Sequence, residues 1–414
     1  MAPAPTSTKT LTTTGNGTVM KTTEESFKLT STSNGSALSN GLNSPLVTSS
    51  NGKVSESLRE KTGSKTDNSK SKRIEDEEPL KLVWRNVFLF IYLHTAAFYG
   101  AYLWLSGQVM WQTFLWGFLF YCMSGFGITG GAHRYWAHRA FKANTPLRLI
   151  LAFMQTVAFQ NSIHEWCRDH RVHHKFTESN ADPHDARRGF IFAHIGWLMC
   201  RKHKDVKEKG KCIDMSDLEA DPIVMFQKNY YVPLVLTISF FIPTLVPWLF
   251  WGENFITAWF FAAQFRYCIT LHMTWLVNSA AHMWGLRPYD KTINPAENKS
   301  VAFWAFGEGW HNYHHVFPWD YKTAEVGQYR YNFTAAFIDF FAWLGWAYDL
   351  KSVPKNIVLQ RVCRTGDGSH ANHVHTESEK EFEHPEAGPW GWGDADIPPE
   401  DIAVTEILYS QKEE

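Results

Sequence analysis

The sequence has almost no net charge and no regular cysteine pattern. Its 414 residues carry 40 Lys and Arg against 41 Asp and Glu, a formal net charge of -1, so no overall basic field favours nucleic acid as a partner. The six cysteines form no Cys-x-x-Cys pair, which indicates unpaired thiols in a reducing compartment. No apolar stretch follows the first residues, so we expect no cleaved signal peptide.

Both ends of the chain lack the apolar content of its middle. Residues 1–75 are rich in Ser, Thr, Asn, Gly and Lys and have few aliphatic side chains. Such a segment buries too little apolar surface to offset the entropy cost of ordering it. We therefore expect a disordered cytosolic tail over 1–75, and a polar, loop-like cytosolic tail over 355–414.

Four apolar runs between these tails are long enough to cross a bilayer. The runs cover residues 83–105, 109–130, 230–251 and 255–277. Only three residues, 106–108, separate the first run from the second, and only Gly252, Glu253 and Asn254 separate the last two. The sequence therefore predicts two helical hairpins, each with a very short turn.

The basic residues indicate how these hairpins are oriented. Neither short turn contains Lys or Arg, whereas the opposite ends of the runs are flanked by Lys81, Arg85, Arg134, Arg139, Lys142, Lys228 and Arg287. Basic flanks stay on the cytosolic side of a membrane, so both termini and the segment 131–229 share that side. Two shorter apolar stretches, 147–159 and 190–199, are either membrane-surface helices or ordinary helices of a cytosolic cap.

Histidines gather on the same predicted side in clusters with metal-ligand spacing. His170, His173 and His174 stand at i, i+3 and i+4, and the pattern returns at 311, 314 and 315. These offsets place imidazoles on one face of a helix, and neutral imidazole is the commonest metal ligand. A looser pair, 133 and 138, precedes both clusters. So many histidines exceed the needs of one ion, which predicts a two-metal centre on helices.

Other polar residues are assigned roles from their neighbours in the sequence. His282 ends the fourth run and shares a helical face with Asn278 and Trp275, so it is a ninth candidate ligand. Carboxylates beside the clusters, Glu165, Asp169, Asp182 and Glu308, are candidates to orient the imidazoles. Arg266 lies within an apolar run and must face the bundle interior. The other histidines are predicted not to bind the metals: 370, 373 and 375 as exposed, 94 and 272 as isolated, and 164, 184, 194 and 203 as lacking ligand spacing.

Four motifs carry a family resemblance. His133-Arg-Tyr-Trp-Ala-His138, His170-Arg-Val-His-His174, Asn278-Ser-Ala-Ala-His282 and His311-Asn-Tyr-His-His315 resemble the histidine boxes of membrane-bound acyl-CoA desaturases of the stearoyl-CoA, or delta-9, type. Arg361-Val-Cys-Arg and Trp390-Gly-Trp-Gly resemble the insect branch. The resemblance implies an all-α membrane protein of the endoplasmic reticulum, with four transmembrane helices in two hairpins and a helical cytosolic cap, and a desaturase domain over 76–354.

The resemblance also implies the chemistry. Such enzymes introduce a cis double bond into a saturated long-chain acyl-CoA, by default at delta-9 of C16–C18 chains. They use O2 and electrons from cytochrome b5, which an NADH-dependent reductase supplies. A non-haem centre of two irons is implied, with Asn278 acting through water and with nine histidine ligands: His133, His138, His170, His173, His174, His282, His311, His314 and His315.

Substrate contacts follow from the same resemblance. The positions that match acyl-CoA contacts are Asn86, Asn161, Arg168, Asp169, Arg201, Lys202 and Trp275. Tyr121 and Gly125 lie one turn apart on the second run, twelve and eight residues before His133. They are a plausible floor for the acyl tunnel. We hypothesise that Gly125 leaves room for a long chain; the alternative is that it serves helix packing.

Two other functions are compatible with parts of this pattern. A histidine-box hydroxylase or related oxygenase shares the clusters and is separated by its product, an alcohol in place of an alkene. A membrane metal transporter would place its ligands within the spans, whereas these clusters sit at the span ends. A fused cytochrome domain would contain His-Pro-Gly-Gly, which is absent, so the electron donor is expected to be a separate protein.

Overall fold

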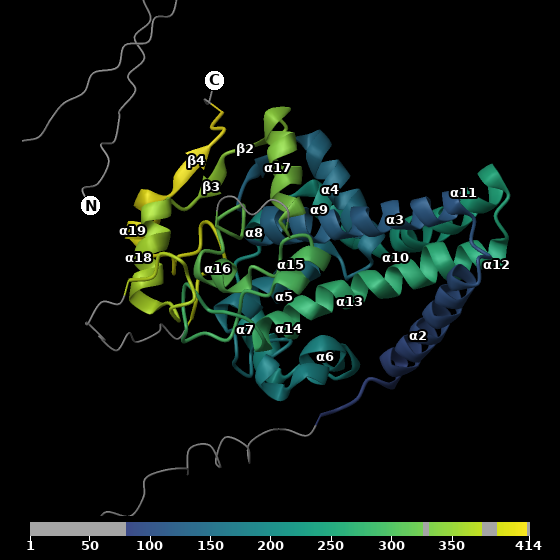
Figure 1. Ribbon diagram of the computed structural model, residues 1–414, viewed down its shortest axis with the longest axis horizontal. Helices are drawn as coiled ribbons and strands as arrows, with labels where there is room; N and C mark the ends of the chain where they lie inside the picture. Colours follow the sequence, from purple (N-terminus) through teal and green to yellow (C-terminus); the bar gives the residue numbers. More distant parts are fainter. Residues whose placement is uncertain (1–79, 326–330, 375–386, 412–414) are drawn as a thin grey trace, which may run out of the picture. The chain divides into compact units, whose positions relative to one another are not determined.

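The computed structural model describes residues 80–325, 331–374 and 387–411 (Figure 1). The predicted tail over 1–75 and His375 lie outside these residues. The described part is built of helices, accompanied by four short strands in two antiparallel pairs. β1 (Lys142–Ala143) pairs with β2 (Ala347–Tyr348), and β3 (Leu350–Ser352) pairs with β4 (Glu406–Leu408).

Within the described ranges, three helical segments are long and apolar enough to cross a membrane. The first is α2 (Trp84–Leu105). The second is α3 (Trp111–Phe126) continued by the π-helical η1 (Gly127–Ala137). The third joins α10 (Tyr231–Val235), η4 (Leu236–Phe241) and α11 (Ile242–Trp251). The fourth predicted run falls on α12 (Phe255–Ala258), η5 (Trp259–Phe265) and α13 (Arg266–Asn278). This run is helical but is not among those three.

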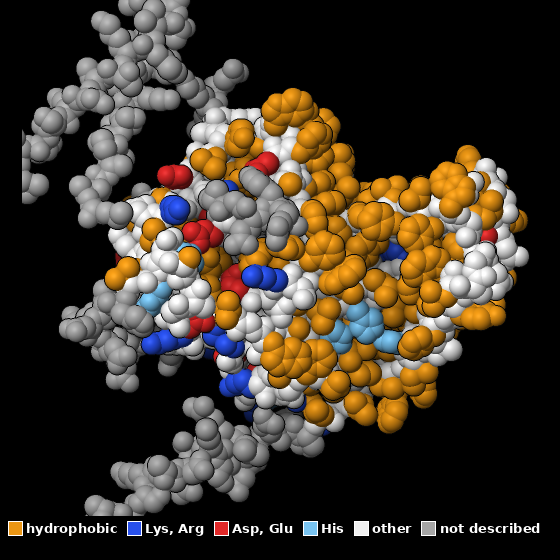
Figure 2. Space-filling view, in the orientation of Figure 1, with side chains coloured by type: hydrophobic (Ala, Val, Ile, Leu, Met, Phe, Trp, Pro, Cys, Tyr) orange, Lys and Arg blue, Asp and Glu red, His pale blue; other side chains and the backbone are white. Residues whose placement is uncertain are grey.

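These long helices expose apolar side chains over a wide surface. Figure 2 shows hydrophobic side chains covering one end of the molecule, and acidic and basic side chains concentrated at the other. On α2, Phe98 is 75% exposed and Leu105 is 78% exposed. Water-soluble proteins rarely expose apolar patches beyond a few hundred Å², so this surface is that of a membrane protein.

The turns and the crossings between these helices depend on a few residues. Gly252 ends α11 with φ 72°, a conformation that glycine adopts without strain. The Glu253 side chain accepts hydrogen bonds from Met110 N and Asn254 N at 2.9 and 3.0 Å, which ties the two short turns together. α2 crosses η5 so closely at Gly100 that a Cβ there would lie 2.3 Å from Phe260 O.

Arg266 faces the bundle interior, as its position within an apolar run predicts. It is 3% exposed. Its guanidinium donates to the main-chain oxygens of Val157 and Ser239 at 3.1 and 2.6 Å. Val157 lies near the end of α4 (Thr145–Ala158) and Ser239 lies within η4, so the arginine joins α13 to both helices. A buried charge is tolerated here because oxygen acceptors surround it.

The two shorter apolar stretches form helices beside the bundle. α4 buries Leu147 and Leu151 but leaves Leu149 and Phe153 54% and 40% exposed, so its outer face also carries apolar side chains. The second stretch forms η3 (Phe192–Gly196) and α6 (Trp197–Met199). The other elements before residue 230 are α5 (Ile163–Lys175), η2 (Ala186–Arg188), α7 (Lys204–Gly210), α8 (Ser216–Glu219) and α9 (Pro222–Asn229).

The described residues after 354 differ from the loop-like tail that the sequence predicts. α18 (Lys355–Thr365) buries Val358 and Val362, and β4 pairs with β3. Trp390 and Ile397 are each 3% exposed. Apolar side chains in this segment are few but regularly placed, and they pack against the rest of the fold. The remaining elements are α14 (Ala280–Met283), α15 (Lys299–Trp304), α16 (His311–Val316), α17 (Phe333–Trp343) and α19 (Pro399–Val404).

Candidate metal centre

Four separate elements bring the predicted histidines together. α5 begins with a capping box, in which the Ser162 hydroxyl accepts from Glu165 N at 3.3 Å and bonds the Glu165 carboxylate at 3.0 Å. This cap fixes where the helix starts and so which face carries its three histidines. η1 carries His133 and ends at His138, α14 carries His282, and α16 carries the third box.

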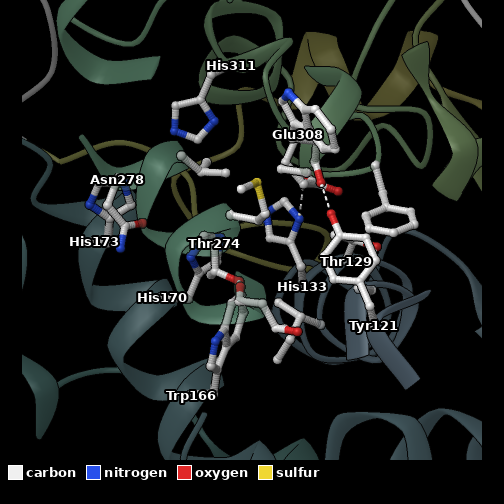
Figure 3. Close-up of a pocket in the computed structure, with 18 residues that line it drawn as sticks. Tyr121, Thr129, His133, Trp166, His170, His173, Thr274, Asn278, Glu308 and His311 are labelled. Atoms are coloured by element: carbon white, nitrogen blue, oxygen red, sulfur yellow. Dashed lines mark hydrogen bonds and ion pairs between the residues drawn. The ribbon is translucent and has the colours of Figure 1, made fainter. Parts of the chain in front are cut away.

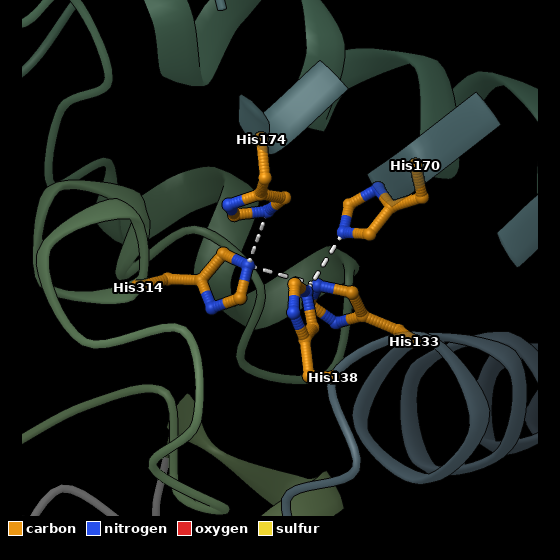
Figure 4. Close-up of side chains that lie close together, drawn as sticks. All are labelled: His133, His138, His170, His174 and His314. Carbon is orange, nitrogen blue, oxygen red and sulfur yellow. Dashed lines mark hydrogen bonds between the residues drawn. The ribbon is translucent and has the colours of Figure 1, made fainter. Parts of the chain in front are cut away.

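Five imidazoles form one cluster, shown in Figure 4. Its members are His133, His138, His170, His174 and His314, whose ligand atoms all lie within 4.8 Å of one another. The Nε2 atoms of His133 and His314 are 2.9 Å apart, as are those of His138 and His170, and those of His314 and His174 are 3.0 Å apart. Every ring therefore points its Nε2 atom at a common centre.

Four further imidazoles form a second cluster. Its members are His173, His282, His311 and His315, again within 4.8 Å of one another. The Nε2 atom of His311 lies 2.9 Å from that of His282 and 3.1 Å from that of His315. Asn278 and His173 both line the cavity drawn in Figure 3. All nine predicted histidines thus fall into a set of five and a set of four.

The geometry and protonation of both sets fit metal ions. Ligand nitrogens about 2.1 Å from an ion are about 3.0 Å apart at right angles and about 3.4 Å apart in a tetrahedron. The observed separations of 2.9 to 3.1 Å match right angles. Burial also holds the pKa of seven imidazoles well below the ordinary value, which keeps them in the neutral form that binds metal. These are His138, His170, His174, His282, His311, His314 and His315.

Carboxylates orient one ring in each set. His133 Nδ1 lies 2.8 Å from Glu308 Oε2, and the other carboxylate oxygen accepts from Arg134 Nε and Nη2 at 3.1 and 2.8 Å. Burial alone would raise the pKa of Glu308, but Arg134 and His133 outweigh it and lower the pKa to about 2. In the second set, His173 Nδ1 lies 2.9 Å from Asp182 Oδ1. Each carboxylate favours Nδ1–H and leaves Nε2 free to bind a metal.

A main-chain oxygen orients the His138 ring, as the carboxylates orient His133 and His173. His138 Nδ1 hydrogen-bonds the carbonyl of Trp390, which lies 252 residues further along the chain. Trp390 falls within the segment predicted as a polar tail, and its motif was linked only to the insect branch. Its Trp-Gly-Trp-Gly pattern was the available signal, since two tryptophans between glycines suit burial with close backbone approach.

An apolar cavity of about 620 Å³ opens beside both sets (Figure 3). The residues at its metal end are His133, His170, His173, His311, Glu308 and Asn278. The residues along its wall include Ile128, Thr129, Trp166, Thr270, Met273, Thr274 and Val277. A mostly apolar cavity that ends at the two histidine sets suits a flexible hydrocarbon chain.

The two residues proposed to set the chain length line this cavity, and the side chain of Phe306 packs against both. Tyr121 and Gly125 both line the cavity, and the Tyr121 hydroxyl donates to Trp304 O at 2.8 Å. A Cβ on Gly125 would lie 2.5 Å from the Phe306 ring. The space beside the glycine is therefore filled by Phe306 and is not left open. Sequence spacing cannot place Phe306 there, because it approaches from a different part of the chain.

Four of the predicted acyl-CoA contacts lie close together. Asp169 bonds Arg168 at 3.1 Å and also pairs with Lys202. Arg201 is adjacent to Lys202 and is exposed. The result is a basic group at the surface, neutralised in part by one carboxylate.

The other three contacts lie in different surroundings. Asn86 donates to Leu198 O at 2.8 Å and so lies near the segment that carries Arg201. Asn161 is exposed and has φ 69°. Trp275 is 3% exposed, and its ring centre is 5.6 Å from that of Phe90 on α2.

Two histidines predicted to be isolated belong to a hydrogen-bonded chain. The Nε2 atoms of His94 and His272 are 3.1 Å apart, His272 Nδ1 is 2.9 Å from His194 Nε2, and His194 Nδ1 is 2.9 Å from Ser279 Oγ. The prediction of isolation was wrong, because these residues meet only when α2, η3 and α13 pack together.

The folded C-terminal part corrects a second histidine prediction. His370 Nε2 lies 2.7 Å from Glu325 Oε2, and its side chain is 13% exposed, so it is not the exposed residue that its polar surroundings suggest. His184 packs against the second set, with its ring centre 4.3 Å from that of His173.

The fold and the site together define a helical membrane protein with two polyhistidine sets that fit metal ions beside an apolar cavity. Comparison with known proteins agrees: the fatty acid desaturase family matches residues 110–349, more than half of the chain. The chain therefore belongs to the fatty acid desaturase family, which confirms the resemblance drawn from the histidine motifs.

Named relatives align over most of the chain. An acyl-CoA Delta-9 desaturase of Acheta domesticus is 61% identical over 333 residues, which is 80% of this chain and 88% of the relative. An acyl-CoA Delta12-desaturase of the same organism is 54% identical, covering 83% of this chain and 91% of the relative. A human stearoyl-CoA desaturase is 54% identical, covering 70% of this chain and 80% of the relative.

Proposed function

We propose that the protein introduces a cis double bond into a saturated long-chain acyl-CoA, with O2 as co-substrate and electrons from a separate cytochrome b5 and its NADH-dependent reductase. One observation carries the proposal: two sets of nitrogen ligands stand side by side at the end of an apolar cavity. The relatives' names, acyl-CoA and stearoyl-CoA desaturases, support the substrate class.

The ligand sets fit two irons. Five nitrogen donors in one set exceed the four ligands of a closed tetrahedral zinc site, and neither set contains a thiolate, which disfavours softer metals. The five-histidine set would hold one iron and the four-histidine set the other, with Asn278 bound to the second through a water molecule. When bound, the irons supply the O2-derived oxidising power that unactivated C–H bonds require.

The chain's own residues position the substrate and exclude water. Ile128, Met273 and Val277 present apolar surface along the cavity, so the acyl chain is bound by the burial of its methylene groups. Trp166 stacks on His170, with ring centres 4.8 Å apart. This indole fixes one metal-binding ring and also forms part of the cavity wall.

The CoA end would bind at the surface group around Asp169. Arg168, Arg201 and Lys202 offer donors for phosphate oxygens, and Asn86 lies beside them. Asn161 and Trp275 complete the proposed contacts. The same basic surface would attract the acidic surface of cytochrome b5.

The proposed setting is the endoplasmic reticulum membrane, with both termini cytosolic. The helical run from α12 to α13 would be the fourth span, which pairs with α11 through the turn at Gly252. With four spans, α5 and α16 lie on the same side of the membrane. With three spans, the membrane would separate α5 from α16. The observed meeting of these two helices supports four spans.

Product analysis tests this function and its position of attack. The protein would be expressed in a yeast strain that lacks its own desaturase, and double bonds would be located by derivatisation and mass spectrometry. We expect cis delta-9 products from C16 and C18 chains, and none from the His170→Ala variant. Hydroxylated chains would identify a hydroxylase, and a delta-12 product would assign the alternative position that one of the Acheta relatives is named for.

A further inference from the structure

A short C-terminal segment contacts both helices that carry the first two histidine boxes. We name residues 388–394 the C-terminal clasp. Trp392 N donates to His138 O at 2.8 Å, at the end of η1, and Gly388 N donates to Lys175 O at 3.2 Å, at the end of α5. The last carbonyls of a helix have no partner within the helix, so the clasp supplies one to each helix end.

The clasp holds the imidazole of His138 as well as its backbone. The Trp390 carbonyl accepts from His138 Nδ1, which fixes the proton on Nδ1 and leaves Nε2 facing His170 at 2.9 Å. His138 is 0% exposed. The residue that follows it, Arg139, has φ 53°, so the chain turns sharply there. No side-chain carboxylate bonds His138 in the described residues, unlike His133 and His173.

Several buried interactions fix the clasp in place. Asp394 accepts from Lys175 Nζ at 2.7 and 2.9 Å and from Trp390 N at 2.8 Å. The Trp390 ring lies under two guanidinium groups, 4.1 Å from that of Arg171 and 5.0 Å from that of Arg139. The Asp394 side chain is only 4% exposed, so its bond to Lys175 is shielded from solvent.

Close packing at one glycine shows that the fit is specific. Gly391 has φ 152°, and a Cβ there would lie 2.6 Å from both Cα and O of His138. No side chain fits in this space without moving the clasp or the histidine. The clasp and His138 therefore occupy fixed positions relative to each other.

We propose that the C-terminal clasp is a positioning element for His138, and through it for the five-histidine set alone. This inference rests on the proposed two-metal centre. Trp390 supplies the acceptor, Gly391 permits the approach, and Asp394 with Lys175 locks the segment to α5. Outer partners of metal-binding histidines change metal affinity by about 10- to 100-fold, so loss of the clasp weakens one metal and spares the other.

The main test compares two glycine variants of the full-length protein in detergent. Gly391→Ala displaces the clasp. Gly368→Ala is the matched control, because Gly368 also has a positive φ, 87°, but no atom lies within 4 Å of its added Cβ. Cobalt(II) is titrated into metal-free protein and followed by visible absorption. We expect Gly391→Ala to weaken one of two binding phases by about tenfold or more, and Gly368→Ala to leave both unchanged.

Two further variants separate positioning from general stability. Asp394→Asn removes the charge that holds the clasp and is expected to weaken the same phase as Gly391→Ala. Asp182→Asn, beside His173, is expected to weaken the other phase. Equal weakening of both phases by Gly391→Ala, or wild-type affinity for both, would overturn the proposal, since a clasp that only stabilises the fold would not distinguish them.

A readout without metal distinguishes this proposal from the proposed function. Diethyl pyrocarbonate acylates accessible imidazoles, and mass spectrometry reports which ones react. In metal-free protein we expect His138 to react faster in Gly391→Ala than in wild type or Gly368→Ala, with His282 unchanged. Equal protection of His138 in all three proteins refutes the clasp. A wild-type protein that binds one cobalt refutes the two-metal centre, while the acylation rates still decide the clasp.

Discussion

The substitution Glu308→Gln tests how the carboxylate beside His133 supports the five-histidine set. One carboxylate oxygen accepts from Arg134 and the other faces His133 Nδ1 at 2.8 Å. A glutamine offers one oxygen and one NH2 group in the same place. Either orientation therefore turns the NH2 group toward a donor, which is Arg134 in one case and the Nδ1–H of His133 in the other.

The expected magnitude follows from these contacts. If the glutamine NH2 group faces His133, the imidazole must move its proton from Nδ1 to Nε2, where the proton blocks metal binding. Loss of such an outer partner weakens metal affinity by about 10- to 100-fold. If the glutamine NH2 group faces Arg134, a charge-assisted hydrogen bond worth about 1.5–3 kcal/mol is lost in a buried site. Both orientations lower either the stability of the protein or its metal affinity, and the glutamine adopts the orientation with the smaller loss.

Two measurements on the same preparation check this reasoning. Cobalt titration should show one phase weakened by about tenfold or more, and thermal unfolding of metal-free protein should show a stability loss of about 3 kcal/mol or less. The matched control is Glu165→Gln, a carboxylate in the capping box of α5 that bonds Ser162 and lies outside both sets. Wild-type affinity and stability in Glu308→Gln would refute the orienting role of the carboxylate.

Three further outcomes are expected. Phe306→Leu should extend the cavity beside Gly125 and shift products toward longer chains, measured by competition between acyl-CoAs; an unchanged profile counts against this floor. Arg168→Met should raise the KM for acyl-CoA about tenfold with kcat unchanged; an equal fall in kcat contradicts a binding role. Because folded imidazoles such as His174 have lowered pKa values, unfolded chains bind more protons below about pH 6.5. Metal-free protein should therefore lose stability as pH falls from 7 to 5, by up to about 1.4 kcal/mol per pH unit for each such histidine; pH-independent unfolding would contradict it.

The histidine boxes were predictable because their information is local. Spacing of i, i+3 and i+4 fixes one helix face whatever the tertiary structure, and all nine histidines of the two sets were named from it and from the family resemblance. Their division into five and four was not predictable. His133 meets His314 across 181 residues, and His173 belongs to a different set from its neighbour His174. Which ring faces which ion depends on how α5 is rotated against η1 and α16.

Features formed by distant segments were missed for related reasons. Phe306 fills the space beside Gly125, and a glycine in a sequence does not reveal what occupies the place of its side chain. The clasp was assigned to a polar tail because the sequence after residue 355 is charged and loop-like, although Trp390 is 3% exposed. His94 and His272 pair across two helices, so their spacing along the chain carried no signal.

The most direct test of the central claim is the metal content of purified protein with one ligand removed from each set. We predict two irons per wild-type chain by elemental analysis, and one in each of His170→Ala and His282→Ala. X-ray absorption should report only nitrogen or oxygen neighbours, and each variant should make no alkene. A wild-type chain that binds one metal, or variants that retain two, would contradict the two-metal account of this desaturase.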